Sequence, residues 1–318
     1  MSACPLKGSP LSYCIKKNLP LVSVVIPSYN HCRHITECVE SVANQTYQNI
    51  ELIIIDDGST DGSIDVINNL VVNLRRRFTR FEFRSRTNKG LSSTMNEGLD
   101  WCRGEFFSPI ASDDVMLVEK VRVQVEFMIK NPHVDCLFSN VRIINEHSNV
   151  ISCKKKNSGF VSFEDLFLYK KSILAPTLLA KTAALRSVGG YPSNLYIDDW
   201  YMWLTLTFFD YQLYQTPDVL VSYRKHTSNA SSDLKKMHEA RRQIILRYFS
   251  KHKLCDLALA CTDVQYAVEI LNFDRVKSLK LFFSALVAKP NILLQIKIYH
   301  YLVRFFAPYV WYQALKFS

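Results

Sequence analysis

The sequence predicts an α/β fold, in which a mostly parallel sheet is flanked by helices and followed by a C-terminal helical extension. Short β-branched runs alternate with segments of helical spacing four times between residues 21 and about 130. This alternation is typical of a parallel sheet in which each strand is followed by a helix. A chain of 318 residues is long enough for one such domain and an appended region.

The predicted elements follow from the spacing of apolar residues. Continuous apolar runs of four to eight residues favour buried strands, and apolar residues three or four apart favour helices. Strands are expected at Leu21–Pro27, Glu51–Asp56, Phe78–Arg84, Glu105–Ile110, Val134–Ile144 and Leu220–Tyr223. Helices are expected at His31–Asn44, through Ile64–Leu70, from Asn88 to Leu99, from Val118, at Phe163–Tyr169 and at Ile197–Phe209.

Three regions are predicted. Residues 1–19 form an N-terminal lead-in, residues 20–232 form the α/β domain, and residues 233–318 form a basic, aromatic-rich helical region. The last region has 14 Lys/Arg and 6 Asp/Glu, a net +8 within a chain total of +10. Mixed cations and aromatics suit the headgroup zone of a membrane. Packing of the same aromatics on the α/β domain explains them equally well.

Composition also bears on the compartment. The chain has nine Cys and no CxxC pair, which favours free thiols in a reducing cytosol over a disulfide framework or a cysteine metal site. We find no signal-peptide pattern and no uninterrupted apolar run of about 18 residues. We therefore expect a cytoplasmic protein, peripheral on the inner face of the plasma membrane if the C-terminal region binds lipid.

Polar residues gather where three of the predicted strands end. The clusters are Ser28–Asn30, Asp56–Ser59 and Ser112–Asp114. Ligands bind at the carboxyl edge of open α/β sheets, so a ligand site is expected there. No GxGxxG follows the first strand, which argues against a dinucleotide enzyme. Three acidic clusters at one edge argue against nucleic-acid binding, because carboxylates repel phosphates unless a metal intervenes.

The residues also carry a family resemblance. Residues 22–30 (VSVVIPSYN), 41–47 (SVANQTY) and 51–62, followed by Gly189-Gly190-Tyr191, Asp198-Asp199-Trp200 and Tyr223-Arg224-Lys225-His226, resemble the family 2 glycosyltransferases in order and spacing. The resemblance spans roughly residues 20–230. It implies the GT-A fold, inverting transfer of a sugar from a nucleoside-diphosphate donor to an acceptor hydroxyl, and similarity to bacterial enzymes that build cell-surface polysaccharides.

The resemblance implies a donor site. Asp57 is expected to accept the N3–H of a uracil ring, since a carboxylate has acceptor capacity only. Pro27 and Tyr29 are expected beside the base and the ribose, and Arg86 is a further candidate for contact with the base. A plain turn or helix cap explains the Asp-Asp-Gly-Ser sequence about as well when it is taken alone.

A divalent metal is expected beside the donor diphosphate. By resemblance Asp114 and His226 hold Mn²⁺ or Mg²⁺, and Asp113 contacts the ribose or a metal-bound water. Hard cations favour such carboxylates together with substrate phosphates. An acidic loop that caps a helix is the structural alternative. Ala111 stands where a further Asp is common in the family, which puts one metal or ribose contact in doubt.

The acceptor side is expected at the third acidic pair. By resemblance Asp199 is the general base, and Asp198 and Trp200 lie on the acceptor side. Asp198 replaces the more usual Glu, and a helix N-cap is the structural alternative. The expected acceptor is a glycan, lipid-linked in surface polysaccharide synthesis. A non-catalytic assembly partner of the same fold at the membrane is the alternative function.

Overall fold

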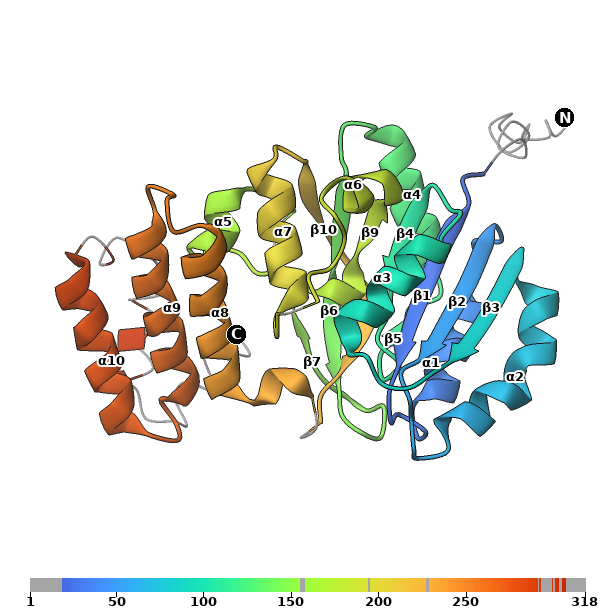
Figure 1. Ribbon diagram of the computed structural model, residues 1–318, viewed down its shortest axis with the longest axis horizontal. Coiled ribbons are helices and arrows are strands. Elements are labelled where there is room, and N and C mark those ends of the chain that lie inside the picture. The colour runs from blue at the N-terminus through green and yellow to red at the C-terminus, as the bar shows by residue number, and fades with distance from the viewer. Residues whose placement is uncertain are drawn as a thin grey trace, which may run out of the picture.

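A computed structural model describes residues 19–154, 158–193, 195–226, 229–290, 292, 299, 301–302 and 305–306. Most of the predicted lead-in therefore lies outside the described residues, as do Tyr309, Trp311 and Tyr312 of the aromatic C-terminal stretch. The described chain is an α/β domain whose sheet is continued by helices at one end (Figure 1).

The first part of the sheet is parallel, as predicted. β1 pairs in parallel with β2 and with β4, and β2 pairs in parallel with β3. Helices cover this part. The strands are β1 (Val22–Ser28), β2 (Ile50–Asp56), β3 (Arg80–Ser85) and β4 (Phe106–Pro109), and the helices are α1 (Ile35–Ala43), α2 (Ser63–Arg77), α3 (Leu91–Trp101) and α4 (Lys120–Lys130). The two-residue strand β5 (Val115–Met116), which precedes α4, lies at the other end of the sheet and is antiparallel to its neighbour.

The second half widens the sheet with mixed pairings. The strand order is β3-β2-β1-β4-β9-β6-β10-β5, with β7 beside β6 and β8 beside β10. β10 runs parallel to β6, whereas β9 is antiparallel to both β4 and β6. The elements are β6 (Cys136–Ile144), β7 (Val150–Lys154), β8 (Gly159–Val161), α5 (Phe163–Phe167), the 3-10 helix η2 (Ala175–Thr177), β9 (Leu179–Lys181), α6 (Thr182–Ser187), α7 (Asp198–Phe208) and β10 (Leu213–Arg224).

The sheet has a hydrophobic core on each face. Successive strand residues point to opposite faces, so Ile53 belongs to one core and Ile54 to the other. One core is closed by α3, α6 and α7, and the other by α1, α2 and α4. This layering explains why the first strands read as continuous apolar runs, since both faces of each strand are buried.

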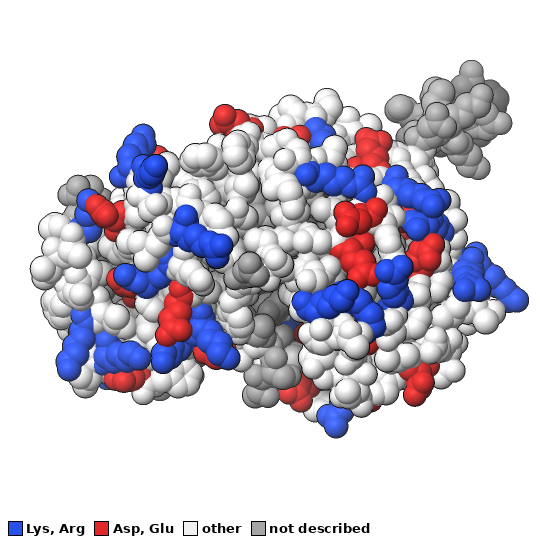
Figure 2. Space-filling model, viewed as in Figure 1, with Lys and Arg blue, Asp and Glu red and all other residues white. Residues whose placement is uncertain are grey.

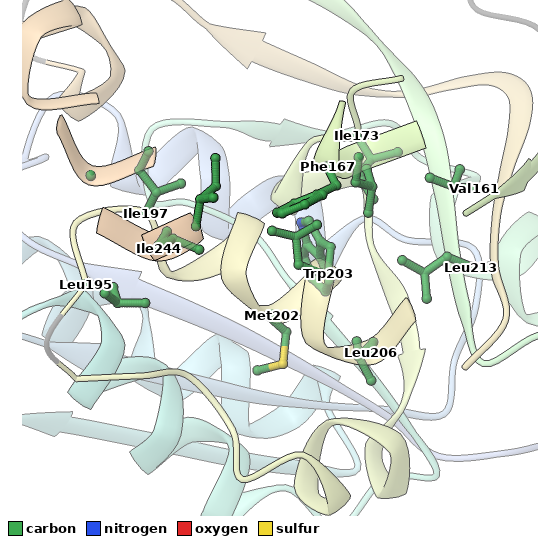
Figure 3. Packing of buried hydrophobic residues seen from close by; sticks show 14 of the residues in the cluster. Val161, Phe167, Ile173, Leu195, Ile197, Met202, Trp203, Leu206, Leu213 and Ile244 are labelled. Carbon is green, nitrogen blue, oxygen red and sulfur yellow. The ribbon is translucent and has the colours of Figure 1, made fainter. Parts of the chain in front are cut away.

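Three helices follow the sheet: α8 (Leu234–Tyr248), α9 (Cys255–Ile270) and α10 (Arg275–Ala288). α8 and α9 share the core of α5 and α7, and Figure 3 shows Ile244 of α8 among the residues around Trp203. Aromatic rings seal the joint: Phe249 lies 5.4 Å from Phe163 and 5.6 Å from Phe167, between ring centroids. The early part of the C-terminal region therefore packs on the α/β domain.

α10 leaves large apolar side chains exposed. Val276, Phe283 and Val287 are 65%, 58% and 83% exposed, and their spacing places them along one side of the helix. In the view of Figure 2, Lys and Arg side chains lie over α8–α10 with fewer acidic ones among them. Among the described residues, no helix combines the length and the apolar content needed to cross a bilayer.

Candidate active site

Hydrogen bonds join the loops that follow β1 and β2 at the carboxyl edge of the sheet. Asn30 has a left-handed backbone, with φ of 53°, which Asn tolerates better than most residues. Its backbone N donates to Ser59 Oγ and its Oδ1 accepts from Thr60 N, both at 2.8 Å. The third loop joins them, because His31 Nδ1 lies 2.7 Å from Ser112 Oγ. The three polar clusters thus lie together.

The Asp57 carboxylate accepts hydrogen bonds at most of its acceptor sites. Its Oδ1 accepts from Lys89 N at 2.7 Å and from the Arg86 guanidinium, and its Oδ2 accepts from Gly90 N at 2.9 Å. Because an ionised carboxylate has about four lone-pair sites, the described residues leave one acceptor site on Oδ2. The side chain is buried, so a donor that takes this last site would bind where competition from water is weak.

Arg86 is a clamp on Asp57. Its Nε donates to Glu97 Oε2 at 2.8 Å and its Nη2 to Thr94 Oγ1 at 2.9 Å, both on α3. Nη1 donates to Asp57 and, at 3.0 Å, to the Thr87 carbonyl. One of the five guanidinium N–H groups therefore remains for a ligand. The main contribution of Arg86 in this structure is to orient the Asp57 carboxylate.

Pro27 and Tyr29 frame the other side of this pocket. Pro27 lies in β1 and is half-buried, whereas Tyr29 stands in the loop after β1 and is 49% exposed. An exposed tyrosine ring beside a buried carboxylate is suited to cover a planar ligand whose edge reaches the carboxylate.

A histidine–carboxylate cluster lies beside the loop after β4. His226 Nε2 is 2.8 Å from Asp113 Oδ2. Ligand atoms of His31, Asp113 and His226 all lie within 4.8 Å of one another. His34 adds a third imidazole, its ring stacked 6.0 Å from that of His226. Burial, with help from the charge of Arg224, lowers the pKa of His34, so this ring favours the neutral form.

Asp114 turns away from the cluster toward β10. Its Oδ1 accepts from Arg224 N at 2.8 Å, while its Oδ2 is buried without a hydrogen-bond partner among the described residues. Burial, and next the charge of Asp113, raises the pKa of Asp114 well above its usual value. The two imidazoles and the carboxylate of the cluster, His31, His226 and Asp113, are a donor set that suits a divalent cation, and Asp114 does not belong to it.

Arg224 is a structural residue. Its side chain is fully buried, and it donates to the Asp113 carbonyl at 2.7 Å, to the Asn145 carbonyl at 3.0 Å and to Glu37 Oε2 at 2.6 Å. These bonds fix the loop that carries Asp113 to β6 and α1. Lys225, the next residue, is exposed. Of the two cations in this motif, Arg224 is therefore bonded within the fold, whereas Lys225 faces solvent.

The Asp198-Asp199 pair opens α7, where the positive end of the helix dipole favours acidic residues. Asp198 Oδ2 accepts from Ser92 Oγ at 2.8 Å, which ties α7 to the start of α3. Asp199 is partly buried, and its Oδ1 accepts from Trp200 N at 2.6 Å. Burial raises the pKa of Asp199 to about 6, and the charge of Asp198 adds to the effect. A carboxylate with this pKa suits a base near neutral pH.

The tyrosine Tyr223 links the two halves of the site. Its side chain on β10 lies within electrostatic range of Asp113, Asp114 and Asp199, whose charges raise its pKa in addition to burial. The base candidate and the metal cluster therefore both lie near Tyr223.

Aromatic residues divide between this region and the core. Trp200 is half-buried and stacks on Tyr169, with ring centroids 5.3 Å apart at 23°. Trp203 is 1% exposed and packs edge-on against Phe138 at 5.0 Å. Trp200 thus lies at the site, whereas Trp203 belongs to the core (Figure 3).

Asn96 and the glycine pair shape the loop before α7. Asn96 Nδ2 donates to the Tyr191 carbonyl at 2.6 Å, and its Oδ1 accepts from Tyr191 N at 2.7 Å. Gly190 has φ of 73°, and a Cβ there would lie 2.5 Å from Asn96 Oδ1. Only glycine fits this close approach.

The sequence motifs do not name two of the residues at the site. His31 follows the predicted loop, three residues before His34, and Tyr169 ends a short predicted helix. Neither belongs to a repeated spacing, so only the folded chain brings His31 to Asp113 and Tyr169 to Trp200. A search of the sequence for polar residues after the first strand would have included His31.

Comparisons with known proteins identify relatives of this chain by sequence and by fold. Residues 23–175 match the family model described as glycosyl transferase family 2. A 114-residue segment, 36% of this chain, is 40% identical to an uncharacterized glycosyltransferase of Haemophilus influenzae and covers 44% of it. A 136-residue segment, 43% of this chain, is 35% identical to a chondroitin synthase of Escherichia coli and covers 19% of it. The chain thus spans less than half the length of these relatives.

Solved structures show the same fold. Staphylococcus aureus TarS in complex with UDP-GlcNAc superposes with a TM-score of 0.60 at 21% identity, over 84% of this chain and 79% of that one. The mannosyltransferase PcManGT from Pyrobaculum calidifontis, in complex with GDP-Man and Mn²⁺, gives 0.57 at 16% identity, over 90% of this chain and 87% of that one. The family match covers residues 23–175, just under half of the chain, and the likeness to solved glycosyltransferases shows that the fold is of the GT-A type.

Proposed function

We propose that this chain is an inverting glycosyltransferase that moves a sugar from a nucleoside-diphosphate donor, UDP-linked, to an acceptor hydroxyl. The observation that carries the proposal is that Asp199 and the hydrogen-bonded Asp113–His226 pair both lie near Tyr223 of β10. A base that titrates near neutrality beside a candidate cation site provides both groups that such a transfer needs.

Asp57 would select the nucleotide. Its one remaining acceptor site on Oδ2 fits the single N3–H of uracil, and Arg86 holds the carboxylate in place. Tyr29 would cover the base or ribose, with Pro27 behind it. A solved relative by fold, TarS, binds UDP-GlcNAc, which supports a uridine donor.

His31, Asp113 and His226 would hold the metal, and Asp114 would stay hydrogen-bonded to Arg224 N. When bound, the cation would neutralise the charge that develops on the leaving diphosphate. Two imidazoles favour Mn²⁺ over Mg²⁺, because imidazole is a poor ligand for Mg²⁺. His31 supplies a ligand in a motif where Ala111 offers no carboxylate. PcManGT, a relative by fold, binds Mn²⁺, which supports this choice.

Asp199 would take the proton of the acceptor hydroxyl as its oxygen attacks C1 of the sugar, opposite the leaving diphosphate. Asp198 would orient the start of α7 through Ser92. Trp200, stacked on Tyr169, would form an apolar wall for a sugar ring of the acceptor.

Release of nucleoside diphosphate tests the proposal. The full chain is incubated with UDP-GlcNAc, UDP-glucose, UDP-galactose, UDP-glucuronic acid and GDP-mannose, each with Mn²⁺, with Mg²⁺ or with EDTA. We expect release of UDP from a uridine donor with Mn²⁺ and loss of release with EDTA. Neither release nor calorimetric binding with any uridine donor would contradict the proposal and favour a non-catalytic assembly partner.

We further propose a lipid-linked glycan acceptor at the inner membrane face. Chondroitin synthases among the relatives by sequence make polysaccharide, and the exposed apolar side of α10 lies among Arg275, Lys277 and Lys280. Basic and aromatic side chains together favour an anionic bilayer surface.

Sedimentation with phosphatidylglycerol vesicles tests the membrane contact. The Phe283→Ser/Val287→Ser double variant should lose most of the vesicle-bound fraction. The matched control is Phe209→Ser/Val72→Ser, which changes side chains that are each 62% exposed outside α10. Equal recovery of both double variants would show that α10 does not bind the bilayer.

A further inference from the structure

One cation of the C-terminal region, Arg241, lies near the candidate base Asp199. Arg241 of α8 is 14% exposed, and its Nη1 lies 3.0 and 3.1 Å from the two carboxylate oxygens of Glu269 on α9. Glu269 also accepts from Gln265 Nε2 at 2.7 Å. A buried guanidinium held in this way has a fixed orientation. Its position is therefore set by the packing of α8 on α9.

The free face of Arg241 is turned to an aromatic stack. Its guanidinium carbon lies 5.8 Å from the centre of the Tyr169 ring, within range of a cation–π contact. Tyr169 stacks on Trp200, and Trp200 N donates to Asp199. A continuous series of contacts thus runs from α9 to the base candidate at the start of α7.

Contacts from two elements hold Tyr169 in this place. It follows Leu168, the C-cap of α5, with the left-handed backbone that commonly ends a helix, φ of 57°. Its hydroxyl accepts from Thr262 Oγ1 on α9 at 3.4 Å. The Tyr169 ring is therefore fixed between the end of α5 and α9.

The charge of Arg241 also reaches Asp199. The titratable groups near Asp199 are Asp198, Tyr191, Tyr223 and Arg241. Burial and Asp198 raise the pKa of Asp199, and Arg241 opposes them. Reciprocally, Asp199 helps raise the pKa of Arg241, against the effect of burial and after the larger effect of Glu269.

We propose that Arg241 is a positioning residue of the acceptor site, so that the helical region after the α/β domain completes the site of transfer. It holds the Tyr169–Trp200 wall in place and favours the ionised form of Asp199. This inference rests on the proposed role of Asp199 as the base. It assigns the C-terminal region a part in catalysis that is separate from membrane binding.

Neighbouring arginines on α8 give a matched test. Arg242 pairs with Asp263 on α9 at 2.8 and 2.9 Å, so Arg241→Met and Arg242→Met each remove one ion pair between the same two helices. UDP release is measured from pH 5 to 9 with the donor that gives the highest wild-type rate in the panel above. Arg241→Met should move the acidic limb of the rate profile up by about half to one pH unit and lower the rate at pH 6 about two- to fivefold.

The remaining variants distinguish the effect of the charge of Arg241 from the effect of its position. Arg241→Lys keeps the charge and should restore most of the acidic limb, whereas Glu269→Gln should reproduce part of the Arg241→Met defect. The Michaelis constant for the donor should stay within about twofold of wild type in all of them. Identical pH profiles for Arg241→Met and Arg242→Met, in an active wild-type enzyme, would overturn the inference and leave the proposed transfer intact. A wild-type chain without UDP release would instead refute the transfer itself.

A measurement that needs no turnover complements the kinetics. Without Arg241, ionising Asp199 should cost the folded state more free energy. The melting temperature of Arg241→Met should therefore fall further between pH 5 and pH 8 than that of Arg242→Met. Equal falls would contradict the electrostatic half of the proposal.

Discussion

The surroundings of Asp199 disfavour its ionised form. Burial and Asp198 hold its pKa at about 6, above the usual value of 3.8. For an acid with a raised folded-state pKa, stability is fully present below about pH 4 and is lost as the pH rises through 6. The folded chain therefore carries an energetic cost at neutral pH in exchange for a carboxylate that is ready to accept a proton.

Asp199→Asn should separate these two effects. The amide keeps the bond from Trp200 N to its Oδ1 but cannot accept a proton, so UDP release should fall about 10²–10⁴-fold while donor affinity by calorimetry stays near wild type. Removing the buried charge should stabilise the fold at pH 7 by about 1–3 kcal/mol in urea unfolding. A large loss of donor affinity would show that Asp199 contacts the donor instead.

His31 should decide the metal preference. With one imidazole removed, the set becomes more oxygen-rich, so His31→Asn should lower activity with Mn²⁺ about tenfold or more and lower it less with Mg²⁺. Titration of Mn²⁺ by calorimetry gives a readout that does not depend on turnover. His133→Asn, at a histidine away from the cluster, is the control. Unchanged Mn²⁺ affinity in His31→Asn would remove His31 from the site.

At the scale of elements, the sequence predicted the first half of the sheet well and the second half less completely. β1 and β2 are buried on both faces, so their composition alone marks them. β10 extends over Leu213–Arg224, although only Leu220–Tyr223 was expected. Pro217 interrupts the pattern, and the register with β6 shifts between Gln215 and Val219. A bulge of this kind is stabilised by tertiary pairing and has no local signal.

For the candidate site, too, the sequence predicted some features and missed others. Asp57, Asp113 and Asp199 were named from motifs, but the partners that define their states come from elsewhere in the chain. The Arg86–Glu97 clamp, the inward turn of Asp114 toward Arg224, and the approach of Arg241 all depend on packing between distant elements. Sequence patterns identify carboxylates at a sheet edge, whereas hydrogen-bond partners decide which oxygens remain for a ligand.

Helix α4 begins with a buried lysine. Lys120 is fully buried, donating from Nζ to Ser108 Oγ at 2.7 Å and to the Leu178 carbonyl at 3.2 Å. Burial lowers its pKa to about 7, from 10.5. For a base with a depressed folded-state pKa, stability is complete above about pH 10.5 and is lost as the pH falls toward 7.

Lys120→Met should remove this dependence. Between pH 7.5 and pH 9, the free energy of unfolding of the wild type should rise by about 1–2 kcal/mol more than that of the variant. Urea unfolding at the two pH values measures the difference, in which the titration of all other groups cancels. The exposed Lys130 at the other end of α4 gives the control, Lys130→Met. Parallel pH dependence in the two variants would mean that Lys120 is charged in the folded chain.

At the scale of the whole molecule, the boundary near residue 233 does not separate two cores. Ile244, Ile245 and Phe249 of the C-terminal region are buried in the cluster that also contains Phe167 and Trp203. We therefore propose that residues 233–290 fold together with the α/β domain. This arrangement gives the helical region three tasks: it closes the core, it supplies Arg241, and it presents the exposed side of α10.

A chain that ends at Ser232 should accordingly fold poorly. Its loss would uncover the aromatic joint at Phe163 and Phe167, and each large side chain moved from core to water costs about 1.5–3 kcal/mol. We expect a fall in melting temperature of 10 °C or more, since about 1 kcal/mol corresponds to roughly 2–4 °C in a domain of this size. Differential scanning calorimetry and binding of a hydrophobic dye would detect the change. A truncated chain that melts like the full chain would show that the α/β domain folds independently. If the truncated chain is unstable, its failure to sediment with vesicles says nothing about membrane binding. Point substitutions on α10, which leave the core intact, therefore test membrane binding more directly than truncation.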